Sequence, residues 1–427
     1  MRLVSRFLRL HKFPIEQRKD ITVNAMMHIS DGSLFFLAMS FISLQTIVPV
    51  FVQSLGGGAI AIGLIPIIWA LGSSLPQIFL KNEKHIPMIK PFVMKIAFYQ
   101  RFSFFITGIA TILVFPLLPL QTDLVLFFIL LSFSAFMGSL SSPNWFYLVS
   151  KTVPVIVRGR VIAIRQLIGS FLGIPSGVII TFILITFHAP YNYGILFVVF
   201  FLISIWSLVF LNKVREFPSE EPEANTKSET FSIRYLLKSN TNFKVYLAGD
   251  IVIQSIMTII PFFSVYALKK FNLPDSAAGS FTTVYMVGMV IGNVVFGIIP
   301  DYFGHKVNIL AMAASLAAAS FFALWSSSIY AYYLVFIFSA IALSILGISR
   351  LGIILEMVEE SKRRFYIAAL SSIASPFVLS GLLNGVIIKH YGYECTFIAY
   401  AVLSVAVFFW ILFKVVDPRR KIRRLEY

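Results

Sequence analysis

LFFLAMSFISLQTIVPVFV, residues 34–52, decides the fold, because this stretch contains no charged side chain. A second run of the same kind, YAVLSVAVFFWILF, occupies residues 400–413. A helix needs roughly 20 apolar residues to cross a hydrocarbon core of about 30 Å, and its backbone must satisfy its own hydrogen bonds there. Runs of this kind therefore predict helices that cross a membrane.

The composition supports a membrane protein, since 58% of residues are hydrophobic and 13% are charged, whereas charged residues make up about a quarter of soluble proteins. The net charge of +16 does not indicate a nucleic-acid partner, because the basic residues are concentrated in particular loops and do not form a folded basic domain. Only Lys269, Lys270 and Lys389 are expected outside. The excess on the other side predicts cytoplasmic loops and two cytoplasmic termini in a cell (inner) membrane.

The apolar runs predict an all-α membrane protein with twelve transmembrane helices in two six-helix bundles. The polar, Glu- and Pro-rich stretch after the sixth run is expected to be a cytoplasmic linker. The predicted organisation is thus an N-terminal bundle over 1–212, a linker over 213–240 and a C-terminal bundle over 241–427. The expected spans are 22–48, 59–80, 92–116, 124–149, 162–186, 192–212, 244–267, 277–299, 308–326, 330–353, 366–388 and 394–415.

The two halves resemble each other in sequence. IVPVFV at 47–52 matches IIPFFS at 259–264, and a constant offset relates Gly63 and Trp69 to Gly279 and Tyr285. Internal repeats are expected in transporters. Chance similarity between apolar segments is the alternative explanation.

The segment GIIPDYFGHK at 297–306 resembles the loop signature of the major facilitator superfamily, with Gly297, Asp301, Gly304 and Lys306 in place. Glycine permits close approach and a positive φ, and an Asp at a helix end can cap amide groups. The resemblance implies that Asp301 belongs to a cytoplasmic charge lock that opens as access alternates. A simple interhelical turn is the alternative.

The corresponding stretch of the first half departs from that signature. KNEKHIPMIK at 81–90 keeps Lys90 but has His85 where the acid would stand. This difference indicates a divergent, bacterial-type member of the superfamily, in which the substrate does not follow from membership.

The expected first helix of each half carries one polar stripe. Asn24, His28 and Asp31 follow at i, i+4 and i+7, and Asp250 and Gln254 at i and i+4. The resemblance implies that these two helices line the central cavity, where a carboxyl group is a candidate proton carrier. The alternatives are a structural ion pair for Asp31, a position nearer the interface for Asp250 and simple packing for His28.

Three arginines lie within or at the end of expected spans. Arg101 is expected to be a structural counter-ion, with Asp31 as its candidate partner, because the resemblance places its helix at the periphery. Arg165 is equally consistent with a structural counter-ion and with a substrate ligand. Arg350 is a candidate for an anionic substrate, with pairing to Glu356 or snorkelling to the interface as alternatives.

Asn144 and Trp145 follow Pro143 near the end of the fourth span. Proline frees a backbone carbonyl, and the indole offers a flat surface for a sugar ring or an aromatic compound. Anchoring at the membrane interface is the other role for Trp145.

These features predict a secondary active transporter that moves a small solute by alternating access, coupled to protons and working as a monomer in the bilayer. No phosphate-binding loop, metal-ligand spacing or nucleophile motif is present, so no enzyme activity, metal or cofactor is expected. A lipid or amphiphile flippase with the same fold is the alternative. A non-transporting receptor is the third possibility, and the short outer loops argue against it.

Overall fold

The computed structural model describes residues 15–79, 87–218, 233–359 and 362–419. His85 and the central part of the predicted linker lie outside the described residues. The described segments are helical, with no β-strand among them. They fall into two compact units, each of which is considered by itself.

Unit 1 comprises residues up to Ser43, Ser54–Gly56 and Ile68–Asn225. Its long helices coincide with the apolar runs, with ends that differ from the expected bounds by several residues, and all but α8 have the length that a bilayer requires. They are α2 (Ile15–Phe41), α5 (Lys90–Leu113), α6 (Leu120–Thr152), α7 (Val155–Gly173), α8 (Ser176–Thr186) and α9 (Tyr191–Asn212). A short 3₁₀ helix, η3 (Phe115–Leu117), follows α5.

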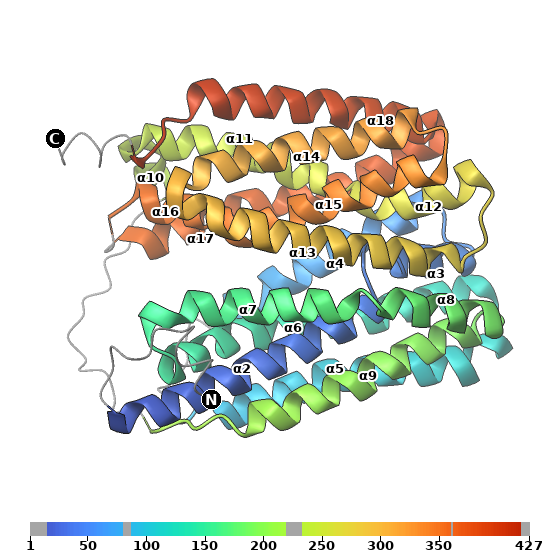
Figure 1. Ribbon diagram of the computed structural model, residues 1–427. Coiled ribbons are helices and arrows are strands. Elements are labelled where there is room, and N and C mark those ends of the chain that lie inside the picture. The colour runs from blue at the N-terminus through green and yellow to red at the C-terminus, as the bar shows by residue number, and fades with distance from the viewer. Residues whose placement is uncertain (1–14, 80–86, 219–232, 360–361, 420–427) are drawn as a thin grey trace. The chain divides into compact units, whose positions relative to one another are not determined.

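Small residues set the helix packing of unit 1. α2 packs against α7 and α9, and α5 packs against α6 and α9 (Figure 1). A side chain at Gly108 of α5 would meet the backbone carbonyl of Gly194 in α9, and one at Gly169 of α7 would overlap Phe36 of α2. Close approach of this kind is typical of membrane helices, which gain little from the hydrophobic effect inside lipid.

Unit 2 comprises Leu44–Gln53, Gly57–Ile67 and Thr226–Tyr427. Its helices in the C-terminal half are α10 (Ile233–Ser239), α11 (Thr241–Met257), α12 (Ile260–Phe271), α13 (Ala277–Phe303), α14 (His305–Trp325), α15 (Ile329–Ser349), α16 (Gly352–Met357), α17 (Arg363–Ala374), η5 (Ser375–Leu379) and α18 (Ser380–Lys414). α3 (Val48–Ser54) and the first part of α4 (Ala59–Phe79) also contribute to this unit. α4 touches α18 where Gly63 and Gly381 leave room for backbone contact.

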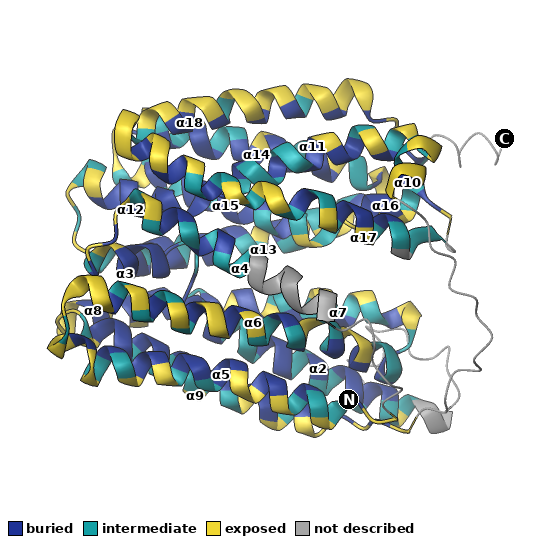
Figure 2. Cartoon of the chain, turned by 180° about the vertical axis from the view of Figure 1, so that it is seen from behind, coloured by how far each residue is buried: buried dark blue, intermediate teal, exposed yellow. Residues whose placement is uncertain are grey.

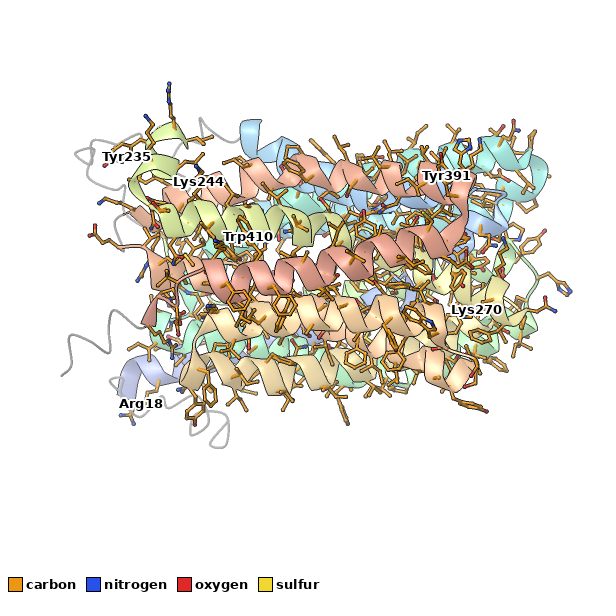
Figure 3. The ribbon with its side chains drawn as sticks, turned by 90° about the horizontal axis from the view of Figure 1, so that it is seen from above. Arg18, Tyr235, Lys244, Lys270, Tyr391 and Trp410 are labelled. Atoms are coloured by element: carbon orange, nitrogen blue, oxygen red, sulfur yellow. The ribbon has the colours of Figure 1, made fainter. Side chains whose placement is uncertain are left out.

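In unit 2, exposed apolar residues and the labelled polar residues lie in different places, as expected for a membrane protein. α18 presents exposed residues along much of its length (Figure 2), among them Val402, Phe409 and Phe413, which are apolar. Tyr235 and Lys244 lie at one end of the unit, and Lys270 and Tyr391 lie at the opposite end (Figure 3). Apolar side chains exposed between polar ends are what a hydrocarbon layer requires.

Within the described residues, eight helical segments are long and apolar enough to cross a membrane, and the bent pair α7–α8 adds a ninth. One of the eight, Phe365–Lys414, covers two predicted spans, because it is broken at Gly392, whose φ of 85° is outside helical space. Together with α2 and α4, these segments account for the twelve expected crossings. The polar stripe of α2 explains why its hydropathy is low.

Candidate functional site

Asn24, in the first half of α2, hydrogen-bonds to the segment that follows α9. Its Nδ2 donates to the backbone carbonyl oxygens of Arg215 at 3.0 Å and Thr152 at 3.3 Å, and its Oδ1 accepts from the backbone N–H of Arg215 at 2.7 Å. Both ends of the amide are thus used by backbone groups. This geometry gives Asn24 a structural position rather than one facing a solute.

His28 lies one turn further along α2 and is fully buried. Its Nε2 is 2.9 Å from Thr152 Oγ1, and its ring meets the edge of Trp145 with centroids 6.0 Å apart. Its Nδ1 has no hydrogen-bond partner among the described residues. The imidazole therefore connects α2 to α6 through Thr152 and packs against Trp145.

Asp31 lines a cavity of about 300 Å³ inside unit 1. The residues that line it come from α2, α4, α5, α6, α7 and α9, and they combine charged, amide, hydroxyl and aromatic side chains. The set is Asp31, Phe35, Phe36, Trp69, Ala97, Gln100, Arg101, Ala135, Gly138, Ser139, Ser141, Ser142, Trp145, Phe146, Ile162, Arg165, Gln166 and Leu211. A volume near 300 Å³ is at the lower end of the range for small-molecule sites.

The carboxyl group of Asp31 is incompletely satisfied. Its Oδ1 lies 3.8 Å from Arg101 Nη2, which is an ion-pair distance but too long for a hydrogen bond. No described residue is a hydrogen-bond partner of this oxygen. A buried carboxylate oxygen without a donor is costly in an apolar surrounding, so this position is suited to a proton or a polar ligand.

Arg101 is held by its own bundle. Its Nε donates to the Ser204 carbonyl at 2.9 Å, its Nη1 to the Ala97 carbonyl at 3.0 Å and its Nη2 to Ser207 Oγ at 2.9 Å. The guanidinium also lies 4.9 Å from the centroid of the Phe35 ring. These bonds fix Arg101 between α5 and α9, with Asp31 as its counter-ion at 3.8 Å.

Arg165 contrasts with Arg101, since its guanidinium makes no hydrogen bond to any described residue. Its Cζ lies 3.9 Å from the centroid of the Trp145 ring and 5.7 Å from that of Phe36, and its buried Nε has no partner in the part of the chain that the structure describes. Asp31 acts on it electrostatically at longer range. Stacking on an indole holds the cation in place without using its donors.

Of the two residues after Pro143, only Trp145 lines the cavity. Asn144 is buried and its Nδ2 donates to the Leu140 carbonyl of the preceding turn at 2.8 Å. The indole Nε1 of Trp145 is buried without a partner among the described residues. α6 continues through Pro143 as one helix.

In unit 2, Asp250 and Arg350 form a closed ion pair. Arg350 Nε is 2.9 Å from Asp250 Oδ1, and its Nη2 is 2.8 Å from Oδ2, which is the bidentate arrangement. With its amide oxygen facing the guanidinium, Gln254 accepts from Arg350 Nε at 2.7 Å. Tyr246 donates to the Arg350 carbonyl at 2.9 Å. Arg350 thus pairs across to α11 and not with Glu356.

Glu356 has another partner, Arg419, whose Nε lies 2.8 Å from its Oε1. The carboxylate also accepts from the His305 backbone N–H, and Arg419 Nη1 donates to the Asp301 carbonyl at 3.0 Å. This cluster sits at the predicted loop signature, where Gly304 has the positive φ of 85° that favours glycine.

The other members of the loop signature take different positions. Lys306 Nζ donates to the Leu412 carbonyl at 2.9 Å. Gly297 has open space where a side chain would stand. Sequence reasoning pointed to Asp301, yet the acid that pairs here is Glu356, and its partner Arg419 lies more than 60 residues along the chain.

Sequence reasoning also missed Glu216. This acid is buried behind α5, where it accepts from the backbone N–H groups of Ile89 and Lys90 at 2.8 and 2.7 Å and pairs with Lys151 at 2.7 Å. It caps the beginning of α5 with charge-assisted bonds. A lone acid directly after the sixth apolar run was the available signal.

Comparison with known proteins places these observations in context. Residues 245–426 match the family model described as Major Facilitator Superfamily. No curated protein matches the chain. A variant of the nucleoside transporter NupG has a TM-score of 0.68 at 11% identity, covering 91% of this chain and 98% of that one.

Two further solved structures are similar. The D-xylose-proton symporter has a TM-score of 0.68 at 16% identity over 94% of this chain and 99% of its own. The human organic anion transporter MFSD10 has a TM-score of 0.60 at 12% identity over 93% and 100%. Identities this low show a shared fold and leave substrates open. The resemblance found in the loop signature is thus confirmed: residues 245–426 carry the sequence pattern of the major facilitator superfamily, and the chain has the major facilitator fold.

Proposed function

We propose that this protein is a secondary active transporter that moves a small solute by alternating access, with Asp31 carrying the coupled proton. The observation that supports this most is the cavity of unit 1, which Asp31 lines and beside which its buried Oδ1 has no hydrogen-bond partner among the described residues. Within a membrane, an ionisable residue that faces a polar cavity marks a solute or proton path.

The surroundings of Asp31 suit a proton that is taken up and released. Arg101 is near enough to stabilise the charged carboxylate at 3.8 Å, yet its hydrogen bonds go to α5 and α9. Loss or gain of a proton at Asp31 therefore leaves the packing of Arg101 in place. The names of the similar structures, which include a D-xylose-proton symporter, are consistent with proton coupling.

Proton movement in proteoliposomes tests the proposal. Purified protein is reconstituted with a pH-sensitive dye inside, and D-xylose, uridine or benzenesulfonate is added outside. We expect at least one solute to move protons through the parent protein and Asp31→Asn to abolish that flux. Asp20→Asn, on the same helix but in an exposed pair with Arg215, should keep it. Parent-like proton flux in Asp31→Asn would remove this residue from the coupling mechanism.

A further inference from the structure

Arg165 is the cation of the cavity whose guanidinium has no hydrogen-bond acceptor among the described residues. It is a buried residue of α7, and its side-chain nitrogens donate to no described residue. Gly32 makes this arrangement possible, because a methyl group there would overlap Arg165 at Nε. The sequence thus leaves room for a guanidinium and supplies it with stacking partners, but not with an acceptor.

The charges around the cavity favour an anion. The lining contains two arginines and one acid, Asp31, so its formal charge is positive. Arg101 is already bound by three groups of unit 1. A buried cation with free donors is expensive in a membrane, and a carboxylate, sulfonate or similar group would remove that cost.

The walls of the cavity favour an aromatic compound. Phe35, Phe36, Trp69, Trp145 and Phe146 contribute rings to it. Trp145 adds a second donor, Nε1, that lacks a partner among the described residues. Aromatic walls around a small number of polar groups are typical of sites for small organic molecules.

We propose that the cavity of unit 1 binds a small aromatic anion, whose charged group accepts hydrogen bonds from Arg165. The proposal rests on the proposed transport function and narrows its substrate class. The guanidinium stays stacked on Trp145 when the anion binds, so binding needs little rearrangement of α7.

Equilibrium binding to the purified full chain in neutral detergent tests the anion site. The probes are benzenesulfonate, its neutral analogue benzenesulfonamide and the cation benzylamine, at constant ionic strength. We expect benzenesulfonate to bind at least about tenfold more tightly than either analogue. Arg165→Gln should lose that preference, and Arg165→Lys should recover part of it. Arg158→Gln is the matched control, because Arg158 is on the same helix but donates to the Ser150 carbonyl.

Gly32→Ala provides a second variant that keeps the charge. The added methyl displaces the Arg165 side chain, and we expect weaker benzenesulfonate binding with the fold retained, since a flexible side chain can move. Gly159→Ala, where nothing lies within 4 Å of the new methyl, should bind like the parent. Equal binding of benzenesulfonamide, or full benzenesulfonate binding in both Arg165→Gln and Gly32→Ala, would overturn the proposal. So would sodium chloride alone displacing benzenesulfonate at equal concentration, which would indicate an inorganic anion site.

This experiment separates the two proposals. Selective benzenesulfonate binding without solute-evoked proton flux would support the anion site and contradict proton-coupled transport. Proton flux with D-xylose or uridine but no benzenesulfonate binding would support transport and contradict the anion site.

Discussion

The two halves of the chain each carry an acid on their first helix and an arginine that reaches toward it, yet the two clusters differ in how far they are satisfied. Asp250 is held by Arg350 at two oxygens, and Gln254 and Tyr246 complete the surroundings. Asp31 has Arg101 at 3.8 Å, and among the described residues its Oδ1 has no donor and the Arg165 guanidinium has no acceptor. The Asp250–Arg350 cluster satisfies its own charges, whereas the Asp31 cluster lines a cavity.

This difference has a consequence for stability. A buried pair that satisfies itself contributes little net stability, but removing one partner is costly. An unsatisfied buried charge costs stability from the beginning and persists where a ligand or proton uses it. Two stripes that look alike in sequence therefore differ in how far their charges are satisfied.

The largest effect that we predict is the loss of stability in Arg350→Gln. This change leaves the Asp250 carboxylate buried without its cation, which costs about 3–5 kcal/mol. Thermal unfolding in detergent should show a much lower midpoint. Lys362→Gln, which removes an exposed pair with Glu359, should stay near the parent. Equal midpoints for the two variants would show that the pair is not closed in the folded protein.

A double variant sharpens the interpretation of that loss. Asp250→Asn combined with Arg350→Gln removes both charges, so we expect it to recover about 2 kcal/mol relative to Arg350→Gln alone. Additive losses in the double-mutant cycle, measured by the same unfolding assay, would argue against a direct Asp250–Arg350 interaction.

The smallest change in the C-terminal cluster is expected for Gln254→Leu. It removes one neutral acceptor from a guanidinium that keeps both bonds to Asp250, which costs about 1 kcal/mol. A loss as large as that of Arg350→Gln, seen in thermal unfolding, would mean that Gln254 and not Asp250 holds the arginine.

The fold and part of the site could be predicted from the sequence for physical reasons. Apolar runs determine the crossings because a bilayer has a fixed thickness. The spacing of Asn24, His28 and Asp31 places them on one helical face, but it does not show that Asn24 turns to the Arg215 backbone while Asp31 lines a cavity. Such differences depend on partners far along the chain, such as Arg215 for Asn24 and Arg101 for Asp31, which periodicity cannot identify.

The arginines illustrate the same point. All three interrupt or end apolar runs, but their hydrogen bonds follow from tertiary packing. Arg101 donates to the Ser204 carbonyl and the Ser207 hydroxyl of α9, Arg350 donates to Asp250, and Arg165 stacks on the Trp145 ring. Only the packed helices show which of them lacks an acceptor.

The most direct test of the contrast is thermal unfolding of Arg165→Gln beside Arg350→Gln in the same detergent. Because no described residue accepts a hydrogen bond from this buried guanidinium, the unfolding midpoint of Arg165→Gln should be unchanged or higher than that of the parent. The free energy of unfolding should rise by at most about 1 kcal/mol. Arg350→Gln should unfold at a much lower temperature. If Arg165→Gln loses as much stability as Arg350→Gln, then Arg165 is a structural residue and the account of the cavity is contradicted.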